Sequence, residues 1–480
     1  MRAIHRDQAG FLWIGTSGGL SRYDTRQNAV YTTFGEWARA VALSDVDVWS
    51  VLAAADGRVW AGLREGGVDI LDPQGNRVGG LRPDTTRPLS ALPPDRVYAM
   101  AQVESGEIFI GTNRGLYRTD AGGARVQRIT VDPAHPDMAV RSLRVAEGRL
   151  WVGTLWEGLW RFDPAKGSAV GHWSRETLTG ERVEAILPTG DGALWIGGSA
   201  GLNRFDIASG TAKKIMPDAA NPLSLSAAWA SALAIDNKGR LWVGTLGGGV
   251  NVMFGRDSQN RPSLMHIGET QGLPNTSAAM LQVDHGGNIW VSTNDGLAVI
   301  DPENFSVQPL HRADGVAIAF NWVNSGAVTK KGEVLFGGSG GMTIIRPEQL
   351  RPWTYQPPVV VADLRVGGRK VDWTVGRKLT VPADGNSLMV EFAALDYSAP
   401  ERNLYAYRLD GYDADWIETP WTQRLASYTN LPPGDYTLSI RGSNREGIWT
   451  DAVLMMAIRV LPAWYQTWSF RGGRRLVSRY

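Results

Sequence analysis

The sequence contains no cysteine among its 480 residues, which excludes disulfide bonds, thiolate metal sites and a cysteine nucleophile. It also lacks an excess of charge of either sign, because 49 Lys and Arg residues stand against 48 Asp and Glu residues, for a formal net charge of +1. A chain with this balance presents no basic field to nucleic acid. We therefore expect no nucleic-acid partner.

Long hydrophobic runs are absent as well. No stretch of roughly 18 or more apolar residues occurs, so no segment of the sequence is predicted to span a membrane. Residues 1–7 do not show the charged and apolar regions of a secretory signal peptide. They are similar to residues 183–186, which lie inside a repeat, and we interpret the chain as an internal piece of a longer polypeptide.

Motifs for metal binding are also missing. The six histidines are scattered and form neither a His-x-His nor a His-Glu-x-x-His pair, so we expect no metal site and no cofactor. The carboxylates are mostly Asp residues in predicted turns, where they have a local structural role. The sequence therefore predicts a protein that is not an enzyme.

The sequence does contain a repeat. A phrase close to Asp-x-x-Gly-x-Leu-Trp-Ile-Gly-Thr-x-x-Gly-Leu-x-x-Phe-Asp recurs about every 46 residues, most clearly at residues 7–24, 147–163 and 191–206. A period of this length, written in strand-forming residues and turn glycines, is typical of a β-propeller blade. The large apolar anchor of the eight copies lies at Trp13, Trp60, Phe109, Trp151, Trp195, Trp242, Trp290 and Leu335.

The eight copies leave two interpretations open. The chain forms an eight-bladed ring, or its first copy belongs to a preceding propeller and the other seven close. The Gly two residues after the anchor, as in Leu-Trp-Val-Gly-Thr, is expected to let neighbouring backbones approach closely. We interpret the repeated Trp side chains as apolar wedges between blades, since a ligand would not need one in every blade.

The last quarter of the sequence has a different character. Residues 351–358 form a proline-rich hinge, and residues 359–461 show short alternating strands separated by turn signals. About 100 residues of this kind are typical of an immunoglobulin- or fibronectin-III-like β-sandwich. We therefore predict an all-β chain, with a seven- or eight-bladed β-propeller over residues 1–350, this sandwich, and a stub over residues 462–480.

The repeat resembles the two-component-regulator propeller (Reg_prop) repeat. The domain after it is similar to the three-Tyr, or Y_Y_Y, domain that follows such propellers. The order and spacing of its motifs agree over nearly the whole domain. The matching stretches are residues 386–392 (NSLMVEF), 394–400 (ALDYSAP), 405–411 (YAYRLDG), 428–436 (YTNLPPGDY) and 443–449 (SNREGIW).

The resemblance implies a function. Proteins of this family are membrane-anchored bacterial receptors whose secreted part holds propellers and the sandwich, followed by a membrane helix and a histidine kinase or diguanylate cyclase. It implies that this chain is a periplasmic ligand-sensing region, that its ligand is an oligosaccharide or another small molecule, and that it forms a homodimer through the sandwich. This sequence contains no membrane helix and no output module, and its aromatic residues 462–470 resemble a segment just before such a helix.

Propeller geometry selects candidate ligand-binding residues. Loops between the second and third strands of a blade open on the same face as the start of the next first strand, around the central channel. Trp side chains beside Arg and Asn suit a sugar ring, which has an apolar face and hydroxyl edges; the alternative is that these Trp residues only cover the blade ends. The candidates on this face are Trp49, Arg64, Asn113, Arg114, Trp156, Trp229, Asn294 and Trp322.

Two other classes of function compete with a receptor. A sialidase- or lyase-like propeller enzyme would need an Arg cluster with a Tyr/Glu nucleophile pair, and no segment singles one out. A free-standing propeller scaffold for protein partners would carry the Gly-His and Trp-Asp dipeptides of WD repeats at fixed positions, and these are absent.

Overall fold

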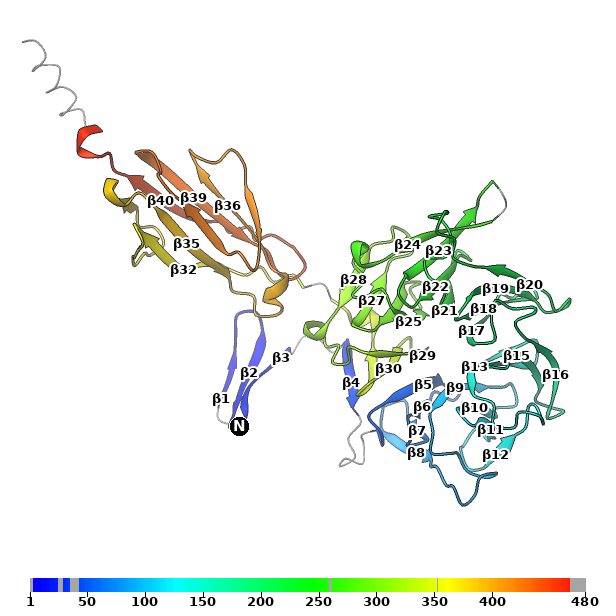
Figure 1. The fold of residues 1–480 in the computed structure, drawn as a ribbon. Coiled ribbons are helices and arrows are strands. Elements are labelled where there is room, and N and C mark those ends of the chain that lie inside the picture. The colour runs from blue at the N-terminus through cyan, green and yellow to red at the C-terminus, as the bar shows by residue number, and fades with distance from the viewer. Residues whose placement is uncertain (1–2, 25–28, 35–42, 259–260, 352, 467–480) are drawn as a thin grey trace, which may run out of the picture. The chain divides into compact units, whose positions relative to one another are not determined.

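The computed structural model describes residues 3–24, 29–34, 43–258, 261–351 and 353–466. The predicted stub therefore lies outside the described residues from position 467 onward. The described chain is almost entirely β-structure and divides into two compact units, residues 27–350 and residues 1–26 with 351–480 (Figure 1). Within these described ranges, no helix has the length and hydropathy needed to cross a lipid bilayer.

The first unit is a β-propeller with seven four-stranded blades among its described residues. Figure 1 shows the first strands of the blades, β5, β9, β13, β17, β21, β25 and β29, gathered at the centre. The blades in chain order are β5 (Val48–Ala53), β6 (Val59–Leu63), β7 (Val68–Leu71) and β8 (Arg77–Leu81); β9 (Val97–Gln102), β10 (Ile108–Thr112), β11 (Gly115–Thr119) and β12 (Val126–Ile129); β13 (Val140–Ala146), β14 (Arg149–Thr154), β15 (Leu159–Asp163) and β16 (Ser168–Trp173); β17 (Val183–Pro188), β18 (Ala193–Gly198), β19 (Gly201–Asp206) and β20 (Ala212–Ile215); β21 (Ala230–Ile235), β22 (Leu241–Thr245), β23 (Gly249–Arg256) and β24 (Pro262–Ile267); β25 (Ala278–Val283), β26 (Ile289–Thr293), β27 (Gly296–Ile300) and β28 (Val307–Leu310); and β29 (Asn321–Val328), β30 (Val334–Gly338), β31 (Gly341–Ile345) with β4 (Val30–Phe34).

The last blade closes the ring with a strand from the start of the chain. Strand β4 pairs antiparallel with β31, with Thr32 opposite Thr343. The Ser325 hydroxyl then donates a hydrogen bond of 3.0 Å to the carbonyl of Val48, which joins the seventh blade to the first. Ring closure removes open sheet edges between blades, and it decides between the two predicted blade numbers in favour of seven.

The repeated Trp residues are interblade wedges, as predicted. Trp60, Trp151, Trp242 and Trp290 are among the largest fully buried side chains. A buried Trp removes about 150–250 Å² of surface from water, so these side chains dominate the contacts between blades. Three 3₁₀ turns lie between strands of this unit or directly after its last strand: η1 (Glu269–Gln271), η2 (Arg312–Asp314) and η3 (Pro347–Gln349).

The first copy of the repeat does not join this ring. Strands β1 (Ala3–Arg6), β2 (Phe11–Thr16) and β3 (Gly19–Asp24) form a separate three-stranded sheet, and residues 1–26 group with residues 351–480. The ring of Phe11 packs against that of Trp353 in a tilted arrangement, with ring centroids 5.2 Å apart. The sheet is mostly exposed, unlike the buried second and third strands of the blades. The predicted division began the propeller at residue 1 and left open that the first repeat belongs to a preceding propeller; the structure separates this repeat from the ring.

The second unit contains the predicted β-sandwich. Its core is a single cluster that includes Phe392, Tyr405, Ile440 and Ile458. Tyr405 and Tyr428 are buried in it, whereas Tyr397 is half exposed and meets the ring of Trp13 edge-on. One sheet consists of β33 (Arg369–Lys370), β32 (Val359–Val366), β35 (Leu388–Ala394) and β38 (Leu425–Tyr428), and the other of β34 (Leu379–Val381), β40 (Leu454–Val460), β39 (Gly434–Gly442), β36 (Leu404–Asp410) and β37 (Ile417–Pro420), with 3₁₀ turns η4 (Ala383–Gly385), η5 (Pro400–Arg402) and η6 (Trp464–Gln466).

Candidate functional site

Loops between second and third strands share one face of the propeller with the starts of the first strands. Arg64, in the loop after β6, lies 3.4 Å from the carboxylate of Asp47, just before β5. In the next blade Asn113 and Arg114 both lie 3.3 Å from the carboxylate of Asp95, just before β9. In these two blades the loop between the second and third strands therefore lies beside the start of a first strand, as expected from propeller geometry. This face contains the mouth of the central channel.

Each first strand carries an irregularity where it starts. In six blades the pairing with the second strand skips one residue, which is a β-bulge, and a bulge re-aims the side chain of the extra residue. In the seventh blade the pairing skips from Asn321 to Gly326. The skipped residues in the first six blades are Trp49, Tyr98, Arg141, Glu184, Ser231 and Ala279.

The side chains at these irregular positions contact one another from blade to blade. Trp322 stacks on Trp49 with centroids 3.9 Å apart, and Tyr98 meets Trp49 edge-on at 5.5 Å. The guanidinium of Arg141 lies 4.0 Å above the ring of Tyr98. Arg141 in turn binds the carboxylate of Glu184 at 3.0 Å.

The same chain of contacts continues into the fifth blade. Arg182 also pairs with Glu184, and its guanidinium lies 4.5 Å above the ring of Trp229. We call the resulting set the mouth belt. It consists of Trp322, Trp49, Tyr98, Arg141, Glu184, Arg182 and Trp229.

The mouth belt combines aromatic faces with a positive electrostatic balance. The carboxylate of Glu184 is fully buried and shared by Arg141 and Arg182, so one cation in this group is not neutralised. A further guanidinium, that of Arg96, lies 5.0 Å above the ring of Trp49. Partly desolvated cations attract acceptor groups and negative charge more strongly than exposed ones.

Three indole N–H groups at the mouth have no acceptor. The Nε1 atoms of Trp49, Trp229 and Trp322 are buried without a hydrogen-bond partner among the described residues. A buried donor without an acceptor is unfavourable by about 1–3 kcal/mol. These three donors therefore favour an oxygen-rich molecule or ordered water at the mouth.

The eight predicted residues share this face but do not form one cluster. Trp49 and Trp322 are brought into direct contact, and Trp229 joins the same belt through Arg182. Arg64, Asn113 and Arg114 pair with Asp residues in the loops. The remaining two, Trp156 and Asn294, are exposed, Trp156 to 64%.

The residues predicted from the sequence did not include four members of the mouth belt that carry polar or charged groups. Tyr98, Arg141, Arg182 and Glu184 occupy the starts of first strands, as Trp49 does. A signal was present, because the second residue of the first strand is not fixed by the repeat: in the seven blades it is Trp49, Tyr98, Arg141, Glu184, Ser231, Ala279 and Trp322. Only the bulge explains why this variable residue points to its neighbours.

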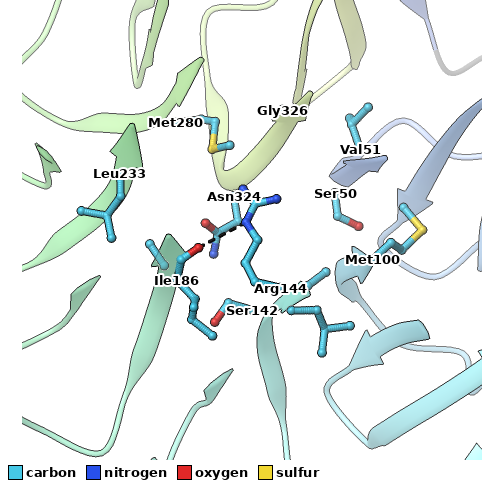
Figure 2. A pocket seen from close by; sticks show the side chains of 13 residues that line it. Ser50, Val51, Met100, Ser142, Arg144, Ile186, Leu233, Met280, Asn324 and Gly326 are labelled. Carbon is cyan, nitrogen blue, oxygen red and sulfur yellow. Dashed lines mark hydrogen bonds between the residues drawn. The ribbon is translucent and has the colours of Figure 1, made fainter. Parts of the chain in front are cut away.

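Behind the mouth lies a small cavity in the central channel. It has a volume of about 50 Å³, and the first strands of all seven blades line it. Figure 2 shows the side chains of Arg144 and Asn324 reaching into this space. Arg144 donates from Nε to the carbonyl of Ile186 at 3.2 Å, and burial lowers the pKa of its guanidinium.

The fold and the mouth belt define a class of protein: a seven-bladed propeller with a polar-aromatic face, joined in one chain to a β-sandwich. Comparison with known families confirms the predicted resemblance. Residues 224–247 match the family model of the two component regulator propeller, and residues 396–461 match that of the Y_Y_Y domain.

Individual relatives extend over nearly the whole chain. The chain is 22% identical to histidine kinase P4 of Formosa agariphila across 94% of its own length, but it spans only 34% of that relative. Its structure is similar to the extracellular domain of BT3049, a protein of B. thetaiotaomicron assigned as a hybrid two component system, with a TM-score of 0.81, 22% identity and coverage of 96% of this chain and 61% of that one. The extracellular domain of BT4673, assigned as a one component system in the same organism, gives a TM-score of 0.53 at 22% identity, covering 96% and 62%. These similarities establish the fold.

Proposed function

We propose that this chain is the extracytoplasmic, periplasmic ligand-sensing region of a bacterial membrane-bound signal-transduction receptor. The histidine kinase of Formosa agariphila, which aligns with nearly the whole chain, supports this assignment. The two solved domains described above are extracellular parts of proteins assigned to signalling systems. The output module in such a receptor is a histidine kinase or a diguanylate cyclase.

The mouth belt is the surface that would contact the ligand. A stacked Trp49–Trp322 pair offers an apolar face to a sugar ring, and Arg96, Arg141 and Arg182 surround the aromatic groups with donors. The three indole N–H groups without acceptors carry this proposal most directly. An oligosaccharide supplies both the stacking surface and the hydroxyl oxygens that these donors lack.

A binding event at the mouth would reach the membrane through the sandwich. We propose that two chains associate through their sandwich domains and that the ligand changes how they associate. Analytical ultracentrifugation with and without ligand measures the fraction of chains that are dimeric. A shift of the monomer–dimer equilibrium on binding is expected, and an unchanged monomer at all concentrations would contradict this part of the proposal.

The proposal predicts that neutral or acidic oligosaccharides bind and raise the melting temperature. A thermal-shift screen identifies the ligand, and isothermal titration calorimetry then gives its Kd. Trp322→Ala and Trp229→Ala each remove an aromatic face together with a free donor. Each substitution should weaken binding about tenfold or more, which corresponds to about 1.4 kcal/mol or more.

Trp421→Ala is the control, because it removes a Trp side chain that lies in the sandwich, away from the mouth belt. Its Kd should equal that of the wild type. Equal affinities for all three variants would remove the mouth belt from the proposal. A stable protein partner recovered with no glycan-dependent thermal shift would favour the scaffold alternative instead.

A further inference from the structure

One charged residue, Arg144, lines the cavity in the central channel, at a strand position that is uncharged in the other six blades and whose residues there do not line the cavity. Arg144 of β13 lies opposite Trp151 in β14, so it occupies the first-strand position opposite the aromatic anchor of its blade. The other six blades have short or uncharged residues at this position. They are Leu52, Ala101, Leu187, Ala234, Gln282 and Ala327.

The positive charge of Arg144 has no counter-charge in the channel. None of the 13 residues that line the cavity is acidic, and Arg144 is the only charged one. Within the described part of the chain its guanidinium forms no ion pair, and its one hydrogen bond goes to the neutral carbonyl of Ile186. The side chain lines the cavity and is exposed to solvent. A guanidinium stays protonated in proteins, so Arg144 presents an unpaired positive charge to whatever occupies the channel.

A second polar group is held in the same cavity by a strained backbone. Asn324 belongs to the irregular segment of β29 and has a φ of +62°. Residues other than glycine rarely adopt this left-handed conformation, although Asn tolerates it better than most. Its amide Nδ2 donates to the carbonyl of Glu184, on β17. The second N–H of this amide is available to a molecule in the cavity, and strain of this kind is found where a side chain is positioned for a ligand.

We propose that the central channel is an anion site, in which the Arg144 guanidinium and the Asn324 amide hold one carboxylate, sulfate or phosphate group. Guanidinium groups match the paired oxygens of such anions. A cavity of this size holds roughly three water molecules, which is about the volume of one such group. The site lies behind the mouth belt and does not depend on the proposed sugar ligand.

The test uses small anions as probes, so it is independent of the receptor hypothesis. The chain is placed in low-salt buffer, and its thermal midpoint is followed against sulfate, phosphate, acetate and glucuronate, with neutral glucose as the uncharged control. The wild type should show a saturable rise of the midpoint, as mass action requires for an anion bound to the folded state. Arg144→Gln should lose this rise. Arg125→Gln is the matched control, since Arg125 is exposed on the same propeller, and it should keep the rise.

Asn324→Asp provides a second variant that preserves shape. Its carboxylate would supply a counter-charge to Arg144 but lose the hydrogen bond to the Glu184 carbonyl, so the response to anions should disappear whatever the midpoint without anion. A response only to sulfate and phosphate identifies a free inorganic anion as the occupant, and a response only to acetate and glucuronate identifies the acidic group of an organic ligand. An anion response that is the same in the wild type, Arg144→Gln and Asn324→Asp would overturn the proposal, and so would the absence of any response in the wild type.

Discussion

At the scale of single residues, a hydrogen bond accounts for the six-residue spacing between the Asp of the turn and the anchor Trp within a repeat. Trp290 donates its indole N–H to Asp284 at 2.8 Å, and Trp242 donates to Asp236 at 2.9 Å. In both pairs the aspartate precedes the Trp by six residues. Where another residue replaces this aspartate, as Ala54 does before Trp60, the buried indole has no partner among the described residues. The aspartate side chain therefore accepts the hydrogen bond of the buried indole N–H as well as those of the turn backbone.

Asp284→Ala should destabilise the propeller by about 2 kcal/mol or more, because it leaves the buried indole of Trp290 without an acceptor. Chemical denaturation followed by Trp fluorescence measures this change. Asp284→Asn keeps one oxygen acceptor and should be clearly milder. Equal effects of the two substitutions would show that the indole hydrogen bond does not matter.

The turn aspartates also predict a dependence of stability on pH. Burial by itself raises the pKa of Asp236, but hydrogen bonds from Trp242 and Arg240 outweigh it and hold this pKa below its usual range. Hydrogen bonds from Thr86 and Arg87 lower the pKa of Asp84 to about 2. A carboxyl group whose pKa is lower in the folded than in the unfolded state stabilises the fold above about pH 4 and loses this contribution as the pH falls through the folded pKa.

The urea midpoint should therefore fall between about pH 4 and pH 2. Asp236→Asn should flatten part of this fall. Asp295→Asn is the control, because the Asp295 side chain is exposed and has no ion pair among the described residues; its profile should match that of the wild type. A wild-type midpoint that stays constant over this range would refute the explanation.

At the scale of strands, the Gly of the second strand sets the distance between blades. A Cβ added to Gly153 would come within 2.6 Å of the Val183 side chain in the next blade, and one added to Gly62 would come equally close to Val97. This close approach confirms the role predicted for the repeated Gly.

Gly153→Ala should reduce stability by about 1–3 kcal/mol, since it forces a methyl group into a packed interface. The free energy of unfolding measured with urea tests this. Gly255→Ala, in the third strand of the fifth blade and with nothing within 4 Å of the added Cβ, should have almost no effect. Comparable losses in both variants would mean that backbone flexibility, and not interblade packing, is responsible.

The strands could be predicted from the sequence and the site only in part, because strands follow from local sequence signals and the contacts of the site do not. Hydrophobic period, turn glycines and the anchor Trp are local signals, so the blades could be predicted from them. The fourth strand of the last blade could not, because β4 lies more than 300 residues before its partner β31 and only ring closure brings them together. Trp49 and Trp322 were recognised because they are conspicuous, but their contact depends on bulges that no local pattern encodes.

At the scale of the whole molecule, the two compact units have separate cores. The core of the sandwich includes Phe392 and Ile458 and forms one cluster of its own. Phe392→Ala should destabilise the sandwich by about 3–5 kcal/mol through the lost burial and the cavity left behind. Differential scanning calorimetry should show two transitions, of which only one moves in this variant. A single transition that shifts as a whole would show that the two units unfold together.

The central claim is that the propeller mouth binds a ligand on its aromatic-cationic belt. The most direct measurement is a crystal structure of the chain with the first oligosaccharide that raises its melting temperature. The proposal predicts electron density for a sugar ring against Trp49 and Trp322, with hydroxyl oxygens accepting from the indole N–H groups at the mouth. Density for the same ligand only elsewhere, with the belt occupied by water alone, would contradict it.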